Sequence, residues 1–292
     1  MAEERKNRET MEREEFYCLY KKLVHEFTFE EREGVGLYRL PSFSREKGIA
    51  HGFTARTGGV SLPPYASLNL SFTNDDRDRV LENYSRFARA AGFPEDSMVM
   101  DNYEHGTTVF IVGKDELGRG HTLPSLPPCD GLVTAVPGVT LITGHADCMA
   151  FFFYDRKKGI IGLCHAGWRG ALGRIGSEVV KKMRLLGSDP KDILAGVGPS
   201  ICPKCFEVGE DVAKLFEEAF PHCPLRGVNE KGNPTVDLWQ VALCQFLESG
   251  ILPEHVSLMG VCTRETDNLY SYRREGRTGG MAAYLRLVGE EK

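Results

Sequence analysis

Three nearly continuous apolar runs lie in the middle of the chain, and they restrict its fold more than any other feature. The runs cover residues 139–143, 149–155 and 159–165, and a short polar turn separates the second from the third. A strand with one face in water alternates apolar and polar residues, but these runs hardly alternate. We therefore expect strands whose two faces are both covered, in the middle of a layered structure.

Amphipathic helices are expected around these strands, because apolar residues recur elsewhere at spacings of three and four. The expected helices cover residues 76–92, 171–187, 208–219 and 237–249, and further strands are expected at 36–40, 49–55, 192–198 and 256–261. No repeat or linker follows residue 34. The sequence thus predicts an α+β fold, a single domain over residues 34–292 in which mixed β-sheets pack together and helices flank them.

Residues 1–33 differ in composition from the rest of the chain. Seventeen of them are charged, whereas Phe16, Leu19, Leu23 and Phe27 recur at helical spacing. This pattern predicts a charged N-terminal helical extension with a narrow apolar stripe. Packing against the domain is favoured over binding a partner, and the sequence does not identify a protein partner.

The charge balance excludes several classes of protein. The chain has 36 Lys and Arg against 41 Asp and Glu, a formal net charge of −5, which gives no support for a nucleic-acid binder or an anionic-membrane binder. No run approaches the roughly 20 apolar residues that a membrane span needs. The first residues lack the apolar core of a secretory signal, and nine cysteines are typical of free thiols in a reducing compartment. A cytoplasmic protein is expected.

Three residues that commonly bind metals lie at the ends of apolar strands. His105 precedes one strand, Cys148 lies between two strands, and His165 ends a third. A set of two histidines and one cysteine suits Zn²⁺ with a fourth position open. The three residues are too far apart in the sequence for a local metal-binding turn, so their spacing alone does not show that they meet.

Five motifs in order resemble the laccase-domain or multicopper polyphenol oxidase family, also catalogued as the peptidoglycan editing factor family. They are TARTGGVSLPPYASLNLSF, HADC, HAGWRG, GPSICPKCFEVG and SYRREGRTGG, and the resemblance extends from about residue 51 to residue 287. It implies a Cys-hydrolase-like α/β/β/α sandwich. It also places His105, Cys148 and His165 on the family's three zinc ligands. The chain departs from the family pattern at Tyr103 and Glu104, and at His145 beside the site.

The resemblance implies chemistry on purine nucleosides. Members are similar to zinc-dependent purine nucleoside phosphorylases, which convert adenosine, inosine, guanosine or methylthioadenosine and phosphate to base and pentose 1-phosphate, and which also deaminate adenosine. On this basis Asp147 and Glu104 are candidate proton-transfer groups beside Cys148. The remaining candidates bind substrate: Arg56 and Arg169 the phosphate, Trp168 the purine, and Ser67 and Asn69 the ribose or base. Packing by Trp168 and a turn capped by Ser67 and Asn69 are the structural alternatives.

Other enzymatic readings use the same residues differently. In a Cys–His amidase acting on a peptidoglycan precursor, Cys148 would be the nucleophile and His165 or His105 its base. A copper-dependent polyphenol oxidase would need many histidines, whereas the chain has eight and no paired HxH motif, so Cu²⁺ is less favoured than Zn²⁺. A binding module acting through the N-terminal helix would leave the candidate ligands unexplained.

The remaining cysteines and the C-terminal arginines are secondary candidates. Cys202 and Cys205 form a C-x-x-C pair, with His222 and Cys223 further on, but ordinary loop packing is favoured over a second metal site. Cys164 lies in an apolar run and is predicted to be core. One further group either closes over a pocket or pairs with the acidic surface: Tyr270, Tyr272, Arg273 and Arg274.

Overall fold

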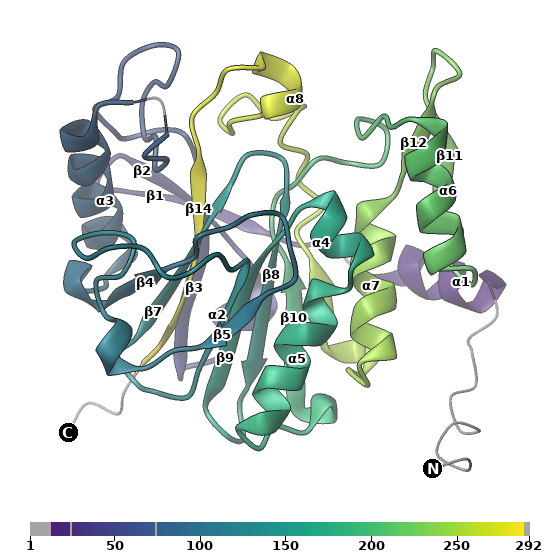
Figure 1. Ribbon diagram of the computed structural model, residues 1–292, viewed down its shortest axis with the longest axis horizontal. Helices are drawn as coiled ribbons and strands as arrows, with labels where there is room; N and C mark the ends of the chain where they lie inside the picture. Colours follow the sequence, from purple (N-terminus) through teal and green to yellow (C-terminus); the bar gives the residue numbers. More distant parts are fainter. Residues whose placement is uncertain (1–12, 24, 74, 289–292) are drawn as a thin grey trace.

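Two six-stranded mixed sheets pack face to face in the computed structural model, which describes residues 13–23, 25–73 and 75–288 (Figure 1). The first sheet has the order β1 (Thr28–Arg32), β2 (Val35–Arg39), β3 (Ile49–Thr54), β14 (Met281–Leu287), β7 (Thr140–His145), β4 (Met98–Met100). The second has the order β13 (Val256–Leu258), β10 (Ile193–Val197), β8 (Met149–Asp155), β9 (Ile160–Ala166), β6 (Gly131–Thr134), β5 (Val109–Ile111).

The apolar runs of the sequence form the buried strands of these sheets. Every residue of β8 and β9 is buried. Phe152 packs into the cluster between the two sheets, whereas its neighbours Phe151 and Phe153 pack into the cluster under the helices. Because successive side chains of a strand point to opposite faces, a strand covered on both faces needs an unbroken apolar run. The prediction of covered strands in a layered fold is confirmed.

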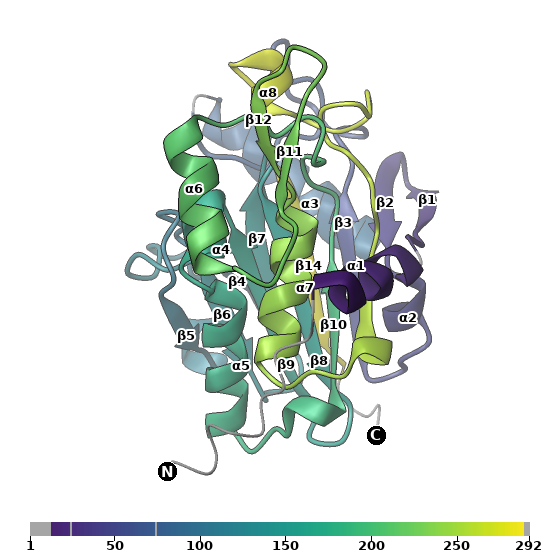
Figure 2. The same ribbon diagram turned by 90° about the vertical axis from the view of Figure 1, so that its right-hand side faces the viewer.

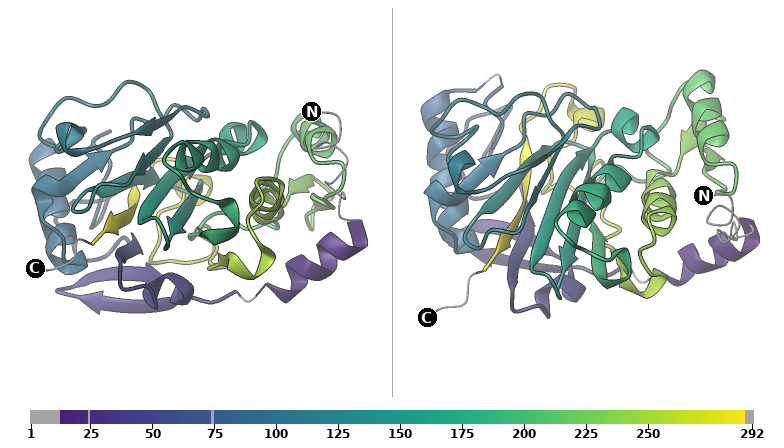
Figure 3. Two further views of the ribbon diagram at one scale, coloured as in Figure 1. Left: turned by 90° about the horizontal axis from the view of Figure 1, so that it is seen from below. Right: turned by 60° about the horizontal axis from the view of Figure 1, so that its bottom comes forward.

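Helices cover the outer face of each sheet and complete four layers (Figure 3). Helix α3 (Arg77–Ala91) packs on the first sheet; Asp76 accepts hydrogen bonds from two N–H groups at its start, and Gly92 ends it with φ 78°. The second sheet is covered by α4 (Trp168–Leu172), α5 (Ile175–Leu185), α6 (Glu210–Ala219) and α7 (Leu238–Glu248). The helix predicted at 171–187 is therefore wrong in extent, because Arg174 adopts φ 64° and separates α4 from α5.

The described part of the N-terminal segment contains one helix and one strand. Helix α1 (Arg13–Lys22) lies beside α7 (Figure 2), where Phe16 is buried and the Tyr20 hydroxyl donates to Asp237 at 3.4 Å. Within the predicted helical extension, residues 28–32 instead form β1, which pairs with β2. The part of that extension at residues 1–12 lies outside the described residues.

Shorter elements connect the layers. They are α2 (Pro41–Ser44), α8 (Tyr272–Glu275), the hairpin β11 (Arg226–Val228) and β12 (Pro234–Val236), and the 3-10 turns η1 (Glu95–Ser97), η2 (Lys114–Glu116), η3 (Pro190–Asp192) and η4 (Pro253–His255). Among the described residues, no helix is both long enough and apolar enough to span a bilayer.

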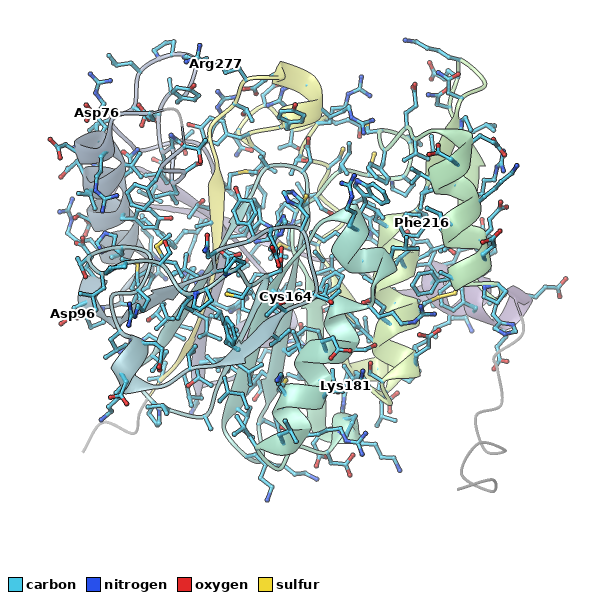
Figure 4. The ribbon with its side chains drawn as sticks, in the orientation of Figure 1. Asp76, Asp96, Cys164, Lys181, Phe216 and Arg277 are labelled. Atoms are coloured by element: carbon cyan, nitrogen blue, oxygen red, sulfur yellow. A yellow bond between two sulfur atoms is a disulfide. The ribbon has the colours of Figure 1, made fainter. Side chains whose placement is uncertain are left out.

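Two cysteines differ from expectation. Cys223 and Cys244 form a disulfide, so the prediction that the cysteines are free thiols is wrong for this pair. Cys164 is fully buried in the interior, as predicted (Figure 4). The other free cysteines are Cys18, Cys129, Cys148, Cys202, Cys205 and Cys262.

Candidate metal centre

The three predicted ligands meet at one edge of the second sheet. Strands β8 and β9 are antiparallel, with Ala150 opposite His165, so the residue before β8 lies at the same edge as the end of β9. Cys148 occupies that position, and His105 approaches from the segment before β5. One nitrogen of each histidine and the Cys148 sulfur all lie within 4.8 Å of one another. The structure thus brings together three residues that lie far apart in the sequence.

A buried carboxylate orients the cluster from behind. Asp130 is fully buried and accepts a hydrogen bond from His165 Nδ1 at 2.9 Å, which leaves His165 Nε2 for the cluster. Its oxygens also accept the backbone N–H groups of residues 104, 105 and 106 at 3.2, 2.9 and 2.8 Å. Burial raises the pKa of Asp130, but the hydrogen bonds from His165 and from these N–H groups outweigh burial and lower it. Sequence reasoning missed Asp130; the available signal was an acidic residue directly before the apolar run of β6.

Backbone conformation at the cluster is unusual. His105 and Asp147 adopt φ values of 63° and 87°, in the left-handed region that costs energy for residues with a side chain. A Cβ on Gly167 would lie 2.8 Å from His105 Cδ2 and 3.4 Å from Cys148 Sγ. Glycine is therefore the residue that leaves these side chains room to meet.

Electrostatic coupling favours ionised Cys148. Burial raises the pKa of its thiol, but the charge of His165 and a hydrogen bond from His105 lower it to about 6. Burial lowers the pKa of His165, yet the Cys148 thiolate and the bond to Asp130 raise it to about 10. Burial also lowers the pKa of His145 well below its usual value, so this neighbouring imidazole is neutral. A thiolate is the form that binds a metal or attacks a carbonyl.

A cavity of about 390 Å³ opens on the cluster. This volume lies in the range of small-molecule sites. Four aromatic side chains line it together with Arg273: Tyr103, Trp168, Phe206 and Tyr272. A second cavity of about 460 Å³ shares Tyr103 and Tyr272 with the first, so these two rings border both. Helix α8, which contains Tyr272 and Arg273, lies at the top of the molecule in Figure 1.

The predicted proton-transfer residues have different surroundings. Asp147 lines the cavity, but one of its oxygens accepts from Thr263 Oγ1 at 2.6 Å and the other from Arg273 N at 2.7 Å. Asp147 thereby holds the segment that leads into α8. Glu104 is exposed and is not among the residues that line the cavity.

The predicted phosphate ligands have different neighbours. Arg56 Nη1 pairs with Glu275 at 2.8 Å, and its guanidinium lies 4.3 Å from the ring centre of Tyr270. Arg56 would have to exchange this partner to bind an anion. Arg169 is exposed, and its guanidinium lies over the ring of Trp168 at 4.2 Å.

The predicted ribose or base ligands already make hydrogen bonds with other parts of the protein. Ser67 Oγ donates to the Arg56 carbonyl at 3.2 Å, and Asn69 Oδ1 accepts the N–H groups of Ser71 and Gly280 at 3.0 and 2.8 Å. Neither residue lines the cavity on the metal cluster. By contrast Trp168, Tyr272 and Arg273 do line it.

The C-x-x-C pair has unexpected neighbours. Cys202 and Cys205 meet Cys262 and Glu265, with all four candidate ligand atoms within 4.8 Å of one another. Cys223, which the sequence suggested as a further ligand beside this pair, forms a disulfide with Cys244 instead.

Comparison with known proteins gives concordant matches over most of the chain. A family model described as multi-copper polyphenol oxidoreductase laccase matches residues 50–288. A protein named purine nucleoside phosphorylase from Deinococcus radiodurans is 38% identical over 273 residues, covering 88% of this chain and 95% of that protein. Purine nucleoside phosphorylase YfiH from Escherichia coli is 30% identical over 251 residues, covering 85% and 98%. The crystal structure of YlmD from Geobacillus stearothermophilus has a TM-score of 0.84 at 32% identity, covering 91% and 100%.

Proposed function

Because the chain belongs to the multi-copper polyphenol oxidoreductase laccase family, we propose that it is the kind of enzyme its curated relatives are named for, a purine nucleoside phosphorylase. One observation supports this above others. The cluster of His105, Cys148 and His165 opens on a cavity lined by aromatic rings and an arginine. Aromatic rings suit a flat purine, and a guanidinium suits phosphate.

Zn²⁺ is the ion that we propose for this cluster. Two imidazoles and one thiolate are a donor set that Zn²⁺ accepts with a fourth position open, and the space beside Gly167 fits a compact group of ligands. Bound zinc would supply a Lewis acid that lowers the pKa of a water molecule to about 7. Cu²⁺ is the less favoured alternative, as the histidine content argues.

We propose that different side chains around the cavity bind the purine and the phosphate. Trp168 and Tyr103 would stack on the purine of adenosine, inosine, guanosine or methylthioadenosine. Arg273, with Arg169 beside Trp168, would bind phosphate so that one of its oxygens attacks C1′ of the ribose while the base departs. Asp147 would keep Arg273 in place through the backbone hydrogen bond.

Adenosine deamination is proposed as a second reaction of the same cavity. It replaces the C6 amino group by an oxygen from water, releases ammonia and needs no phosphate. Glu104, next to the ligand His105, stays the candidate for proton transfer because the oxygens of Asp147 already accept two hydrogen bonds. Its exposed carboxylate would have to turn into the cavity to do so.

Turnover with and without phosphate tests the proposal. Protein purified without chelator should release hypoxanthine and ribose 1-phosphate from inosine only when phosphate is present, and should form ammonia from adenosine in either case. Cys148→Ala should lose both reactions, whereas Cys18→Ser, at an exposed cysteine outside the cluster, should lose neither. Base release that does not depend on phosphate would refute the phosphorylase.

A Cys–His amidase is the second candidate, favoured by the arrangement of Cys148, His165 and Asp130. His165 bonds to buried Asp130 and lies beside a thiol of lowered pKa, which is the order of groups in a nucleophile–base–acid triad. The two candidates differ in their response to chelation. An amidase would keep cleaving a cell-wall precursor amide after metal removal and would stop on alkylation of Cys148.

A further inference from the structure

A second cluster of metal-binding side chains lies outside the centre described above. It consists of Cys202, Cys205, Cys262 and Glu265. None of the four belongs to the proposed phosphorylase machinery. In the sequence they form two similar pairs, C-x-x-C at 202–205 and C-x-x-E at 262–265.

The topology of the second sheet explains why the two pairs meet. Strands β10 and β13 are parallel neighbours, with Val197 opposite Leu258, so the segments that follow these two strands leave the sheet at the same edge. The pairing continues beyond the strands as a parallel bridge between Ser200 and Cys262. Each short pair of ligands begins four or five residues after the end of one of these strands.

The spacing of the ligand atoms fits a tetrahedral ion. With Zn–S bonds of about 2.3 Å and Zn–O bonds of about 2.0 Å, a tetrahedron has sulfur–oxygen edges of about 3.5 Å. Glu265 Oε1 lies 3.5 Å from Cys205 Sγ, and Oε2 lies 3.9 Å from Cys202 Sγ. The three cysteines are buried, whereas Glu265 is exposed but turns its carboxylate toward the sulfurs.

A backbone donor orients the third sulfur. The Cys202 N–H donates to Cys262 Sγ at 3.4 Å. Such bonds orient a sulfur ligand and stabilise a thiolate.

We propose that Cys202, Cys205, Cys262 and Glu265 bind a second, structural Zn²⁺. Three thiolates and a carboxylate are soft enough for zinc and close the coordination shell. The ion would fix a wall of the cavity at the first cluster, because Ile201 and Phe206, next to these cysteines, line that cavity. The Ile201 N–H donates to the Asp147 carbonyl at 2.9 Å, and Arg273 Nη1 donates to the Cys205 carbonyl at 3.4 Å.

Metal counting on the full-length chain separates the two sites. We expect two zinc ions per chain in the unaltered protein, one in Cys148→Ala, one in Cys205→Ser and two in the control Cys18→Ser. Equal zinc content in Cys205→Ser and in the control would overturn the proposal. The result does not depend on the phosphorylase, since loss of the first site lowers the count in a different variant.

A measurement on unaltered protein covers the case in which Cys205→Ser does not fold. Alkylation followed by peptide mapping should modify Cys202, Cys205 and Cys262 at least tenfold faster after chelation than before it. Equal labelling in the two states would refute the metal. An intact mass four daltons low before reduction would also refute it, because the Cys223–Cys244 disulfide accounts for two of these daltons and a disulfide within the cluster for the other two.

Substitutions at the fourth ligand give the sharpest comparison. Glu265→Cys completes four thiolates and should slow zinc release to a chelator, whereas Glu265→Ala should speed it, both by about tenfold or more relative to the unaltered chain. Identical release rates in Glu265→Cys and Glu265→Ala would show that this side chain does not bind the ion.

Discussion

Replacing Gly167 by alanine should weaken metal binding at the first cluster without unfolding the chain. Gly167 has φ −66° and ψ 166°, which alanine adopts freely, so the substitution adds a methyl group and no backbone strain. That methyl carbon would lie 2.8 Å from His105 Cδ2. Carbon atoms prefer separations of at least about 3.5 Å, so the imidazole has to retreat by about 0.7 Å.

The displacement exceeds what a metal ligand tolerates. Distances at a metal centre hold within about 0.2 Å, and loss of ligand orientation typically costs 10- to 100-fold in affinity. We therefore expect zinc affinity to fall by about 10- to 100-fold, which corresponds to about 1.4–2.8 kcal/mol. Nucleoside turnover at limiting zinc should fall in parallel and should recover when zinc is in excess.

Competition against a chelator of known zinc affinity measures this loss. Gly113→Ala is the matched control, because its added Cβ would meet only ordinary contacts, at 3.8 and 3.9 Å. The Cys205→Ser background removes the proposed second ion from the titration. If Gly167→Ala and Gly113→Ala bind zinc equally well, the three ligands do not converge beside Gly167 and the reasoning fails.

Three further predictions concern residues around the same edge of the sheet and one buried histidine. Asp130→Asn should lower zinc affinity by about 10- to 100-fold, measured by the same competition, because His165 loses a charged acceptor. Arg273→Ala should raise the phosphate KM of phosphorolysis at least tenfold and leave deamination unchanged, whereas Arg56→Ala should lower both activities alike. Steady-state kinetics at varied phosphate concentration distinguish the two variants. The reverse pattern would assign phosphate binding to Arg56. Burial lowers the pKa of His51 from 6.5 to about 3, so the unfolded chain binds more protons in that range and stability falls as the pH drops through it. Urea unfolding should show that His51 lowers the free energy of unfolding by about 2 kcal/mol between pH 7 and pH 5, and this contribution should be absent in His51→Gln. If the variant loses as much stability as the unaltered protein over this range, His51 is not the source.

The buried strands could be predicted from the sequence because each one is a single uninterrupted apolar run, which indicates that both of its faces are covered. In β8 both faces are covered, so Phe151, Phe152 and Phe153 follow one another and leave no alternation to misread. Strand β14 lies at the centre of the first sheet yet was not predicted. It contains two alanines and an arginine, and its partners β3 and β7 are far away in the sequence, so its register depends on contacts that no local pattern records.

The candidate ligands could be predicted by residue type, but the residues that position them could not. Asp130 looks like part of an ordinary polar turn until His165 and three backbone N–H groups are seen to donate to it. The sequence alone favours loop packing for Cys202 and Cys205, because their partners Cys262 and Glu265 come some 60 residues later. The two pairs meet only through the parallel pairing of β10 with β13.

The sheet order itself explains why both clusters lie on one edge. In the order β13, β10, β8, β9, β6, β5, that edge collects the ends of β13, β10 and β9 and the starts of β8, β6 and β5. Five of these strand ends contribute one or two ligands each, whatever their distance along the chain, and the start of β6 contributes Asp130, which orients His165. The loop after β10 is shared, since its cysteines belong to one cluster and Ile201 and Phe206 to the wall of the cavity at the other. Loss of the second ion should therefore disturb substrate binding through that wall more than zinc affinity at His105, Cys148 and His165, whose ligands come from other strands.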